Sequence, residues 1–194
     1  MNQVTVIGAG LAGCEAAYQL SKRGIQVKLY DTKPFKKSPA HQSDKLCEIV
    51  CSNSFKANRV NSAAGLLKEE MRTLDSLLLR CADQCAVPAG GALAVDRELF
   101  SDMVTGAITD DPNIEVVYEE IEKLPEDGVT IIATGPLTHD ALAEDIVAHY
   151  GKSLRFFDAA APIVAADSID MEHAFFESRY GKGGGVTLTP TMWT

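Results

Sequence analysis

The sequence predicts an α/β fold built around a parallel sheet, and three segments near its start carry that prediction. Residues 3–7 are largely apolar, as in a short buried strand, and a helical pattern follows over 11–22. Gly24 is a natural stop for this helix, and residues 26–30 then alternate as a second strand. A strand, a helix and a strand in this order form a crossover that makes the two strands parallel.

The rest of the chain predicts further elements of the same fold class. Residues 32–60 contain prolines, serines and asparagines and predict a long irregular loop, which inside a compact domain is usually functional or disordered. A helical period predicts one helix over about 61–85. Later elements are a strand at 92–95, a helix capped by Asp96 and ending near 108, a strand at 114–118, a buried strand at 129–133, and a helix over 138–150. We expect a first domain over 1–150 and the start of a second or inserted α+β region over 151–194.

Composition and charge narrow the class of protein. The chain has 194 residues, of which 46% are hydrophobic, enough for one domain with a real core. The net charge of −9 argues against a broadly nucleic-acid-binding surface. The segment 33–59 differs, because its six basic and two acidic residues make it +4, which leaves −13 for the rest. Two interpretations stay open: a loop that meets an anionic partner, or a solvated lysine-rich loop.

The cysteines and the absence of export signals indicate a cytoplasmic protein. No secretory signal is visible, and no apolar stretch reaches the ~20 residues of a membrane span. Five cysteines, an odd number, then indicate reduced thiols. The pairs Cys47/Cys51 and Cys81/Cys85 are each separated by three residues, whereas a zinc knuckle uses two. No metal site is expected, and Cys81 and Cys85 are predicted to be buried core thiols.

A glycine motif between the first strand and the first helix predicts a dinucleotide site. Gly8, Gly10 and Gly13 have the G-x-G-x-x-G spacing, and Asp31 closes the next strand 18 residues after Gly13. In the Rossmann fold these glycines allow a tight turn, the approach of a pyrophosphate and close helix–strand packing, and the acidic residue accepts from a ribose. The predicted cofactor contacts are therefore Gly8, Ala9, Gly10, Leu11, Ala12, Gly13 and Asp31. The alternative is a glycine-rich turn in a non-binding α/β domain.

A second segment favours FAD over NAD as the dinucleotide. The strand that begins at residue 129 ends in Ala133, Thr134 and Gly135. In two-dinucleotide flavoproteins a similar strand returns to the cofactor, so by analogy these three residues are also predicted to contact FAD. The first domain is thus expected to be a Rossmann-type FAD-binding domain.

Eight sequence blocks, taken in order, resemble one enzyme family over about residues 1–182. They are Gly8-Ala9-Gly10-Leu11-Ala12-Gly13, Pro39-Ala40-His41, Val50-Cys51-Ser52-Asn53-Ser54, Leu67-Lys68-Glu69-Glu70-Met71, the run from Val87 to Arg97, the run from Ile132 to Thr138, the run from Asp158 to Val164, and Ser178-Arg179-Tyr180. Together they resemble the TrmFO family of folate- and FAD-dependent tRNA (uracil-5-)-methyltransferases.

This resemblance implies a reaction and a set of partners. Methylenetetrahydrofolate donates a one-carbon unit, reduced FAD supplies electrons, NADPH or NADH re-reduces the flavin, and the product is 5-methyluridine in the T-loop of tRNA. Family members use two thiols, of which Cys51 matches one; the other lies in a Gly-Cys-Met-Pro context that this chain lacks. Uracil C5 becomes nucleophilic once a thiolate adds to C6, and a base must later remove the C5 proton. Which of these roles belongs to Cys51 stays open; we favour proton transfer or assistance, with the cysteine of the missing Gly-Cys-Met-Pro context as the nucleophile.

The basic loop around Cys51 supplies the remaining candidate residues. His41, Lys45 and Lys56 could lower the pKa of the Cys51 thiol, and the expected substrate contacts are His41, Lys45, Asn53, Lys56 and Arg59. Arg97 could touch the cofactor or serve the structure. The oligomeric state is not determined by the sequence.

Departures from the family pattern leave alternatives open. Asp31 replaces the more usual glutamate, and Cys14 replaces serine, as it does in the related wobble-uridine-modifying flavoprotein MnmG. After Lys182 the pattern is lost, which suggests a shifted reading frame or a gene fragment that is truncated at the C-terminus. The alternatives are an MnmG-like protein, a general FAD-linked oxidoreductase and a non-catalytic FAD-binding remnant.

Overall fold

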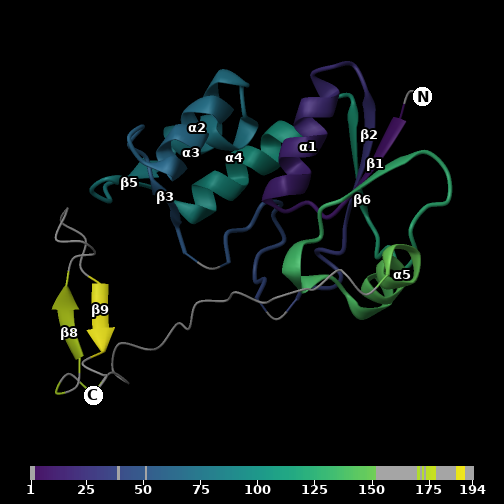
Figure 1. Cartoon of the computed structure of the whole chain (residues 1–194). Coiled ribbons are helices and arrows are strands. Elements are labelled where there is room, and N and C mark those ends of the chain that lie inside the picture. The colour runs from purple at the N-terminus through teal and green to yellow at the C-terminus, as the bar shows by residue number, and fades with distance from the viewer. Residues whose placement is uncertain are drawn as a thin grey trace.

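A four-stranded parallel sheet is the main sheet of the structure (Figure 1). The computed structural model describes residues 3–38, 40–50, 52–151, 170, 172, 174–177 and 187–190. The strands are β1 (Gln3–Ile7), β2 (Gln26–Asp31), β6 (Ile114–Tyr118) and β7 (Val129–Ile132), in the order β6-β2-β1-β7. All three pairings are parallel, with Val4 opposite both Val27 and Val129. The predicted fold class and the first crossover are thereby confirmed.

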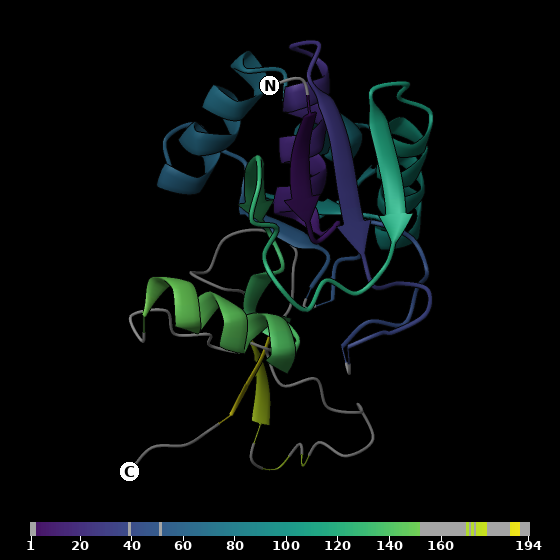
Figure 2. The same cartoon turned by 90° about the vertical axis from the view of Figure 1, so that its right-hand side faces the viewer.

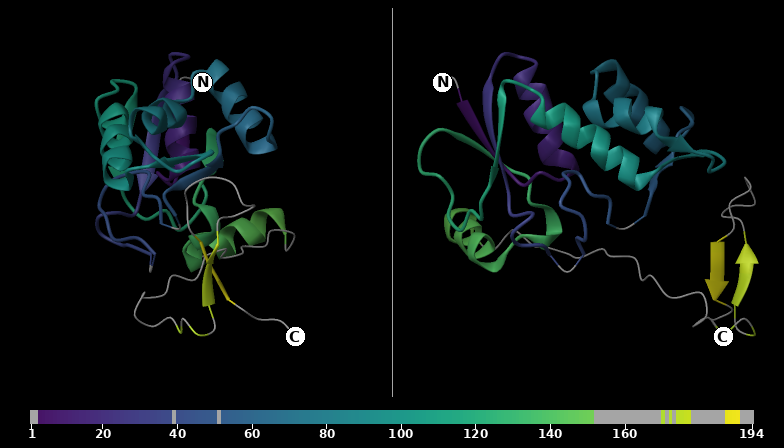
Figure 3. Two further views of the ribbon diagram at one scale, coloured as in Figure 1. Left: turned by 90° about the vertical axis from the view of Figure 1, so that its left-hand side faces the viewer. Right: turned by 180° about the vertical axis from the view of Figure 1, so that it is seen from behind.

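Two helices, α1 (Leu11–Ser21) and α4 (Arg97–Thr109), lie side by side against one face of this sheet (Figures 1 and 3). The side chains of alternate strand residues are buried: Val4 and Val6 in β1, and Val27 and Leu29 in β2. Strand side chains alternate between faces, so these four share the face that the helices cover. Phe100, Val104 and Ile108 lie four residues apart on α4 and are fully buried in the same core.

Strand β7 lies at the edge of the sheet, which corrects one prediction. The segment from Val129 was expected to be a buried strand, yet Val129 and Ile132 are 45% and 37% exposed. The physical reason is that, among the strands the structure describes, β7 pairs with β1 alone, so part of its surface stays open. Its apolar composition indicated a strand correctly but could not indicate an edge position.

The helix predicted over 61–85 is two helices, α2 (Ala63–Thr73) and α3 (Leu77–Gln84). Between them Asp75 has a φ of +56°, a left-handed conformation that ends the first helix, and Ser76 caps the second by accepting from Leu79 N. The continuous apolar period was therefore misleading. Leu66, Leu67 and Leu74 belonged to that period, and all three are exposed.

The predicted irregular loop at 32–60 contains a strand that the sequence did not indicate. β3 (Ser54–Ala57) pairs antiparallel with β5 (Ala92–Val95), and β5 pairs with the short β4 (Ala86–Val87). The rest of this segment is irregular where it is described, as expected. The predicted strand at 92–95 and the Asp96 cap of α4 are confirmed, since Asp96 Oδ1 accepts from Glu98 N and Leu99 N.

Helix α5 (Asp140–Tyr150) lies beyond the carboxyl ends of the strands (Figure 2). Leu142 and Ile146 of this helix pack against Ile7, the last residue of β1. The short 3₁₀ helix Gly135–Leu137 leads from β7 towards α5. Most of the second region predicted over 151–194 lies outside the described residues, which include there the antiparallel pair β8 (Ala174–Glu177) and β9 (Thr187–Pro190).

Candidate functional site

The loop between β1 and α1 adopts the geometry that the glycine motif requires. Gly8 has a φ of +99°, and a Cβ added there would lie 2.7 Å from the carbonyl oxygen of Ala133. A Cβ at Gly13 would lie only 1.7 Å from Gly8 O, so helix α1 can approach the strand only with glycine at this position. Around Gly10, in contrast, no atom lies within 4 Å of an added Cβ. Gly8 and Gly13 therefore serve the fold, whereas the open space at Gly10 is available to a ligand.

The N-terminus of α1 faces this open space without a side-chain cap. Gly10 is its N-cap residue, no side chain accepts from its first N–H groups, and the first turn carries no acidic residue. Ser62, Ser76 and Asp96 cap α2, α3 and α4, whereas α5 also lacks a side-chain cap but carries Asp140 in its first turn. Uncapped N–H groups and the positive end of the helix dipole favour a phosphate at this point.

Asp31, the last residue of β2, lies beside the glycine loop. Its Oδ2 accepts from Ala9 N at 3.0 Å, and its Oδ1 accepts from Lys33 N at 2.8 Å. These bonds hold the carboxylate in one orientation and leave further lone pairs for a ligand. The structure therefore brings Asp31 next to the glycine loop, as the sequence predicted.

The third predicted segment also converges here. Ala133 N donates to Ile7 O at 2.8 Å, which ties the end of β7 to the end of β1. The hydroxyls of Thr134 and Thr138 lie 2.6 Å apart, and Gly135 has a φ of +68°. Residues 133–135 thus lie on the far side of the glycine loop from Asp31.

A cavity of about 340 Å³ connects these segments. Its lining comes from residues 7–12, 30–33 and 133–139, together with Ser38, His41, Glu48, Val50, Glu119, Ile121 and Leu142. In open α/β sheets, ligands bind outside the carboxyl ends of the strands, and this cavity has that position. Glu119 and Glu48 were not among the predicted site residues, although Glu119 directly follows β6 and the same rule applies to it.

His41 joins the cavity from the irregular loop. Its Nδ1 lies 2.6 Å from Ser38 Oγ. Burial lowers the pKa of His41, and the nearby Lys33 ammonium lowers it further, against the opposing effects of Glu48 and Asp31. His41 is therefore a neutral imidazole at neutral pH. Lys33 is itself buried and donates from Nζ to the carbonyl oxygen of Lys45.

The other predicted substrate contacts do not gather in this cavity. Lys45 Nζ is 2.6 Å from Asp102, and Arg59 lies against Gly91 and anchors the start of α2 through its carbonyl, which accepts from Ser62. Lys56 is exposed. The basic segment is partly neutralised, because Lys36 pairs with Glu120 and Lys37 with Asp44 as well.

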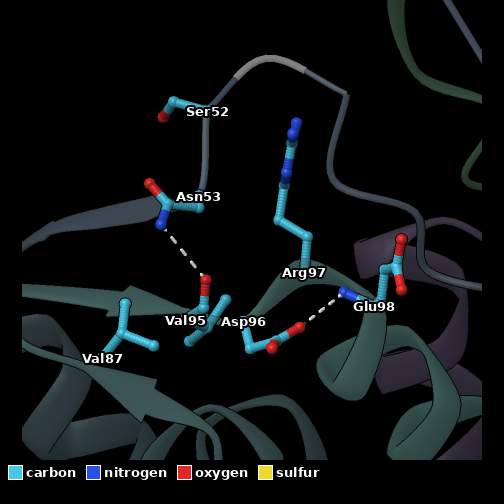
Figure 4. Close-up of a pocket in the computed structure, with 7 residues that line it drawn as sticks. All are labelled: Ser52, Asn53, Val87, Val95, Asp96, Arg97 and Glu98. Atoms are coloured by element: carbon cyan, nitrogen blue, oxygen red, sulfur yellow. Dashed lines mark hydrogen bonds between the residues drawn. The ribbon is translucent and has the colours of Figure 1, made fainter.

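Asn53 lines a second, separate cavity of about 510 Å³, together with Ser52, Val87, Val95, Asp96, Arg97 and Glu98 (Figure 4). Its Nδ2 donates to Val95 O at 3.2 Å. Cys51 lies outside the described residues, between Val50 of the first cavity and Ser52 of the second.

The four described cysteines are buried and free. A hydrogen bond with the Cys14 thiol and burial raise the pKa of Cys47 well above its usual range, and burial raises the pKa of Cys81 and of Cys85. Thiols held in the protonated form are poor nucleophiles and poor metal ligands, so Cys81 and Cys85 are core thiols as predicted. Within the described ranges, no group of three or more His, Cys, Asp or Glu residues could hold a metal ion. No helix among the same residues is long and apolar enough to span a membrane.

This chain is similar in sequence to one family of proteins. The family model described as glucose inhibited division protein A matches residues 3–192. The methylenetetrahydrofolate–tRNA-(uracil-5-)-methyltransferase TrmFO of Lactobacillus gasseri is 58% identical over 193 residues, which cover 99% of this chain and 44% of that protein. TrmFO of Anoxybacillus flavithermus is 59% identical over 191 residues, covering 98% and 44%. This chain therefore spans less than half the length of these relatives.

The resemblance to TrmFO inferred from the eight sequence blocks is thus confirmed. Among solved structures, GidA of Aquifex aeolicus has a TM-score of 0.52 at 17% identity, over 65% of this chain and 21% of that one, a likeness that concerns the fold alone. With 190 residues of the chain inside the matched range of 3–192, the chain belongs to the glucose inhibited division protein A family.

Proposed function

We propose that this chain is the FAD-binding part of an enzyme that methylates uracil C5 in the T-loop of tRNA. The observation that carries the proposal is the 58% identity to TrmFO over 99% of the chain, which includes the glycine loop and the residues around it. The proposed co-substrates are methylenetetrahydrofolate as carbon donor and NADPH or NADH as reductant. The proposed location is the cytoplasm, which agrees with four free thiols among the described residues.

The cavity at the carboxyl ends of the strands fits FAD. The uncapped N–H groups at the start of α1 would hold the pyrophosphate, with Gly10 leaving room for its approach. The oriented carboxylate of Asp31 would accept from the ribose hydroxyls. Residues 133–135 would bound the cofactor from the opposite side. When bound, FAD would supply the electrons that reduce the transferred one-carbon unit to a methyl group.

Cys51 is the proposed reactive residue of this chain. The two residues that flank it in the sequence, Val50 and Ser52, line the first and the second cavity respectively. We propose that its thiol moves the C5 proton of uracil, and that the nucleophile for C6 comes from elsewhere in the complete enzyme. His41, as a neutral imidazole in the first cavity, would be a proton acceptor close to this segment.

A chimera tests the proposal. Residues 1–182 of this chain would replace the matching part of the Lactobacillus gasseri protein, and 5-methyluridine would be measured in a tRNA transcript supplied with methylenetetrahydrofolate, FAD and NADPH. We expect an active chimera, whose Cys51→Ala variant keeps FAD but forms no 5-methyluridine. Cys14→Ser is the matched control, because a serine hydroxyl can keep the donor that Cys14 Sγ offers to Ala9 O. Full activity of Cys51→Ala would defeat the proposed role of this thiol.

A further inference from the structure

The second cavity has a set of hydrogen-bonding groups that the cofactor site does not use. It lies at the junction of β5, the start of α4 and the segment that leads into β3. Val87 and Val95 provide apolar surface, whereas Ser52, Asn53 and Arg97 bring polar side chains (Figure 4). It is an open surface pocket of about 510 Å³, because six of its seven lining residues are exposed and only Val95 is buried.

Three polar groups in this cavity are available to a ligand. Asn53 Nδ2 donates a hydrogen bond to Val95 O, which orients the amide and leaves Oδ1 as an acceptor for a ligand. Ser52 Oγ accepts from Ser54 N at 3.4 Å, so its O–H remains a donor. Arg97 has no hydrogen-bond or ion-pair partner in the part of the chain that the structure describes, so its guanidinium offers several more donors.

The charges in the cavity argue against a phosphate or a carboxylate as the ligand. The carboxylates of Asp96 and Glu98 accompany the single guanidinium of Arg97, which makes the formal charge of the lining −1. The N–H groups at the start of α4 are not available either, because Asp96 already accepts from Glu98 N and Leu99 N at 3.0 Å. A neutral, flat group with both donors and acceptors suits this lining better.

An unstacked nucleobase has these properties. Proteins recognise single-stranded RNA bases by stacking them on apolar or guanidinium surfaces and by hydrogen-bonding their edges. Uracil presents one N–H donor between two carbonyl acceptors. Asn53 Oδ1 would accept from the N–H, and Arg97 and Ser52 would donate to the carbonyls. Cytosine presents a ring-nitrogen acceptor in place of the uracil N–H and an amino donor in place of one carbonyl. Asn53 Oδ1 and one of the two donors in the cavity would therefore be left unpaired.

The location of the cavity fits this ligand. Val50 lines the first cavity and Ser52 lines the second, and two peptide links span at most about 7.6 Å between Cα atoms. A base in the second cavity would therefore lie close to the proposed FAD site. We infer that the cavity of Asn53 and Arg97 receives the uracil base of the RNA substrate, and that these two residues determine its specificity. This inference rests on the proposed function.

Nuclear magnetic resonance of the isotope-labelled 194-residue chain can test the inference, with uridine and cytidine as neutral probes. We expect uridine to shift the signals of residues 52–53 and 95–98, including the Arg97 guanidinium and the Asn53 side-chain amide. Cytidine should bind at least tenfold more weakly, because polar groups of the cavity that pair with the uracil edge would be left unpaired against the cytosine edge. Arg97→Ala should abolish the shifts. Arg23→Ala, which removes an exposed arginine of the α1 end, should preserve them.

FAD added to the same sample separates this inference from the proposed function. Shifts of the Gly8–Gly13 signals on FAD addition, without any response of the second cavity to uridine, would overturn the inference and leave the FAD proposal intact. Equal binding of uridine and cytidine would overturn the assignment of the cavity to uracil. Failure of FAD to shift the glycine loop would count against the proposed function, whereas the uridine response would still decide the inference. Because Arg97 is exposed and unpaired among the described residues, its variant should fold, and the remaining spectrum verifies this.

Discussion

The same methyl group, added at Gly10 or at Gly13, should have two different effects on this protein. At Gly13 the new Cβ would lie 1.7 Å from Gly8 O and 2.9 Å from Gly8 C, and both atoms belong to the backbone that anchors α1 to β1. Such overpacking should lower the free energy of unfolding by about 3 kcal/mol or more. At Gly10 the Cβ meets nothing within 4 Å, and φ and ψ of −76° and −166° suit alanine. The substitution of Gly10 changes only how well the N-cap residue suits the start of α1, which should lower the free energy of unfolding by less than about 1 kcal/mol.

On cofactor binding, in contrast, the methyl group added at Gly10 should have a large effect. Its methyl group would occupy the space through which a pyrophosphate reaches the N–H groups of α1, so we expect FAD affinity to fall at least tenfold, which is about 1.4 kcal/mol. The measurement is a titration of FAD fluorescence with the wild-type chain and with Gly10→Ala, alongside urea unfolding of both and of Gly13→Ala.

Two results would refute this reasoning. A Gly10→Ala chain that binds FAD as tightly as the wild type would show that the pyrophosphate does not approach this residue. A Gly10→Ala chain that is as unstable as Gly13→Ala would show that the loop, and not a ligand, requires glycine at residue 10. The comparison of the two variants separates a structural role from a binding role within one loop.

Three other substitutions test the fold and the electrostatics. Glu15→Ala should lower the free energy of unfolding by about 2 kcal/mol, since its carboxylate accepts from Ser76 Oγ, Leu77 N and Leu78 N; a change below about 0.5 kcal/mol in urea unfolding would contradict this. Asp96→Ala should lower the free energy of unfolding by about 1 kcal/mol, because it removes the cap of α4. Asp96→Asn retains an acceptor and should lower this free energy by less; an equal decrease for the two variants would argue against the cap. The folded-state pKa of His41 is lowered, so below its ordinary value of 6.5 the unfolded chain binds more protons and stability falls as the pH falls. His41→Gln should therefore weaken the fall of the urea midpoint between about pH 7 and about pH 5, and an unchanged pH dependence would show that His41 does not contribute to it.

Local patterns were sufficient to predict the parallel sheet and the glycine loop. A short apolar segment, the spacing of Gly8, Gly10 and Gly13, and Asp31 at the end of the second strand are all encoded within 31 consecutive residues. Turn chemistry and helix capping act over a few residues, so they can be predicted without tertiary contacts, as the Asp96 cap illustrates. The single helix predicted over 61–85 was wrong because the apolar period continues across a break that the left-handed Asp75 and the Ser76 cap introduce.

The sequence by itself determined the fold class, the glycine loop and the likeness to a family of tRNA-modifying flavoproteins. Only the tertiary structure decided which distant residues meet. It brought residues 133–135, His41 and Glu119 to the same cavity as the glycine loop, left β7 at an edge, and separated Asn53 and Arg97 into a second cavity. The physical reason is that the sheet order and the packing of the helices depend on contacts between segments up to a hundred residues and more apart, such as Ala133 N with Ile7 O. No local pattern contains the information on which strands become neighbours.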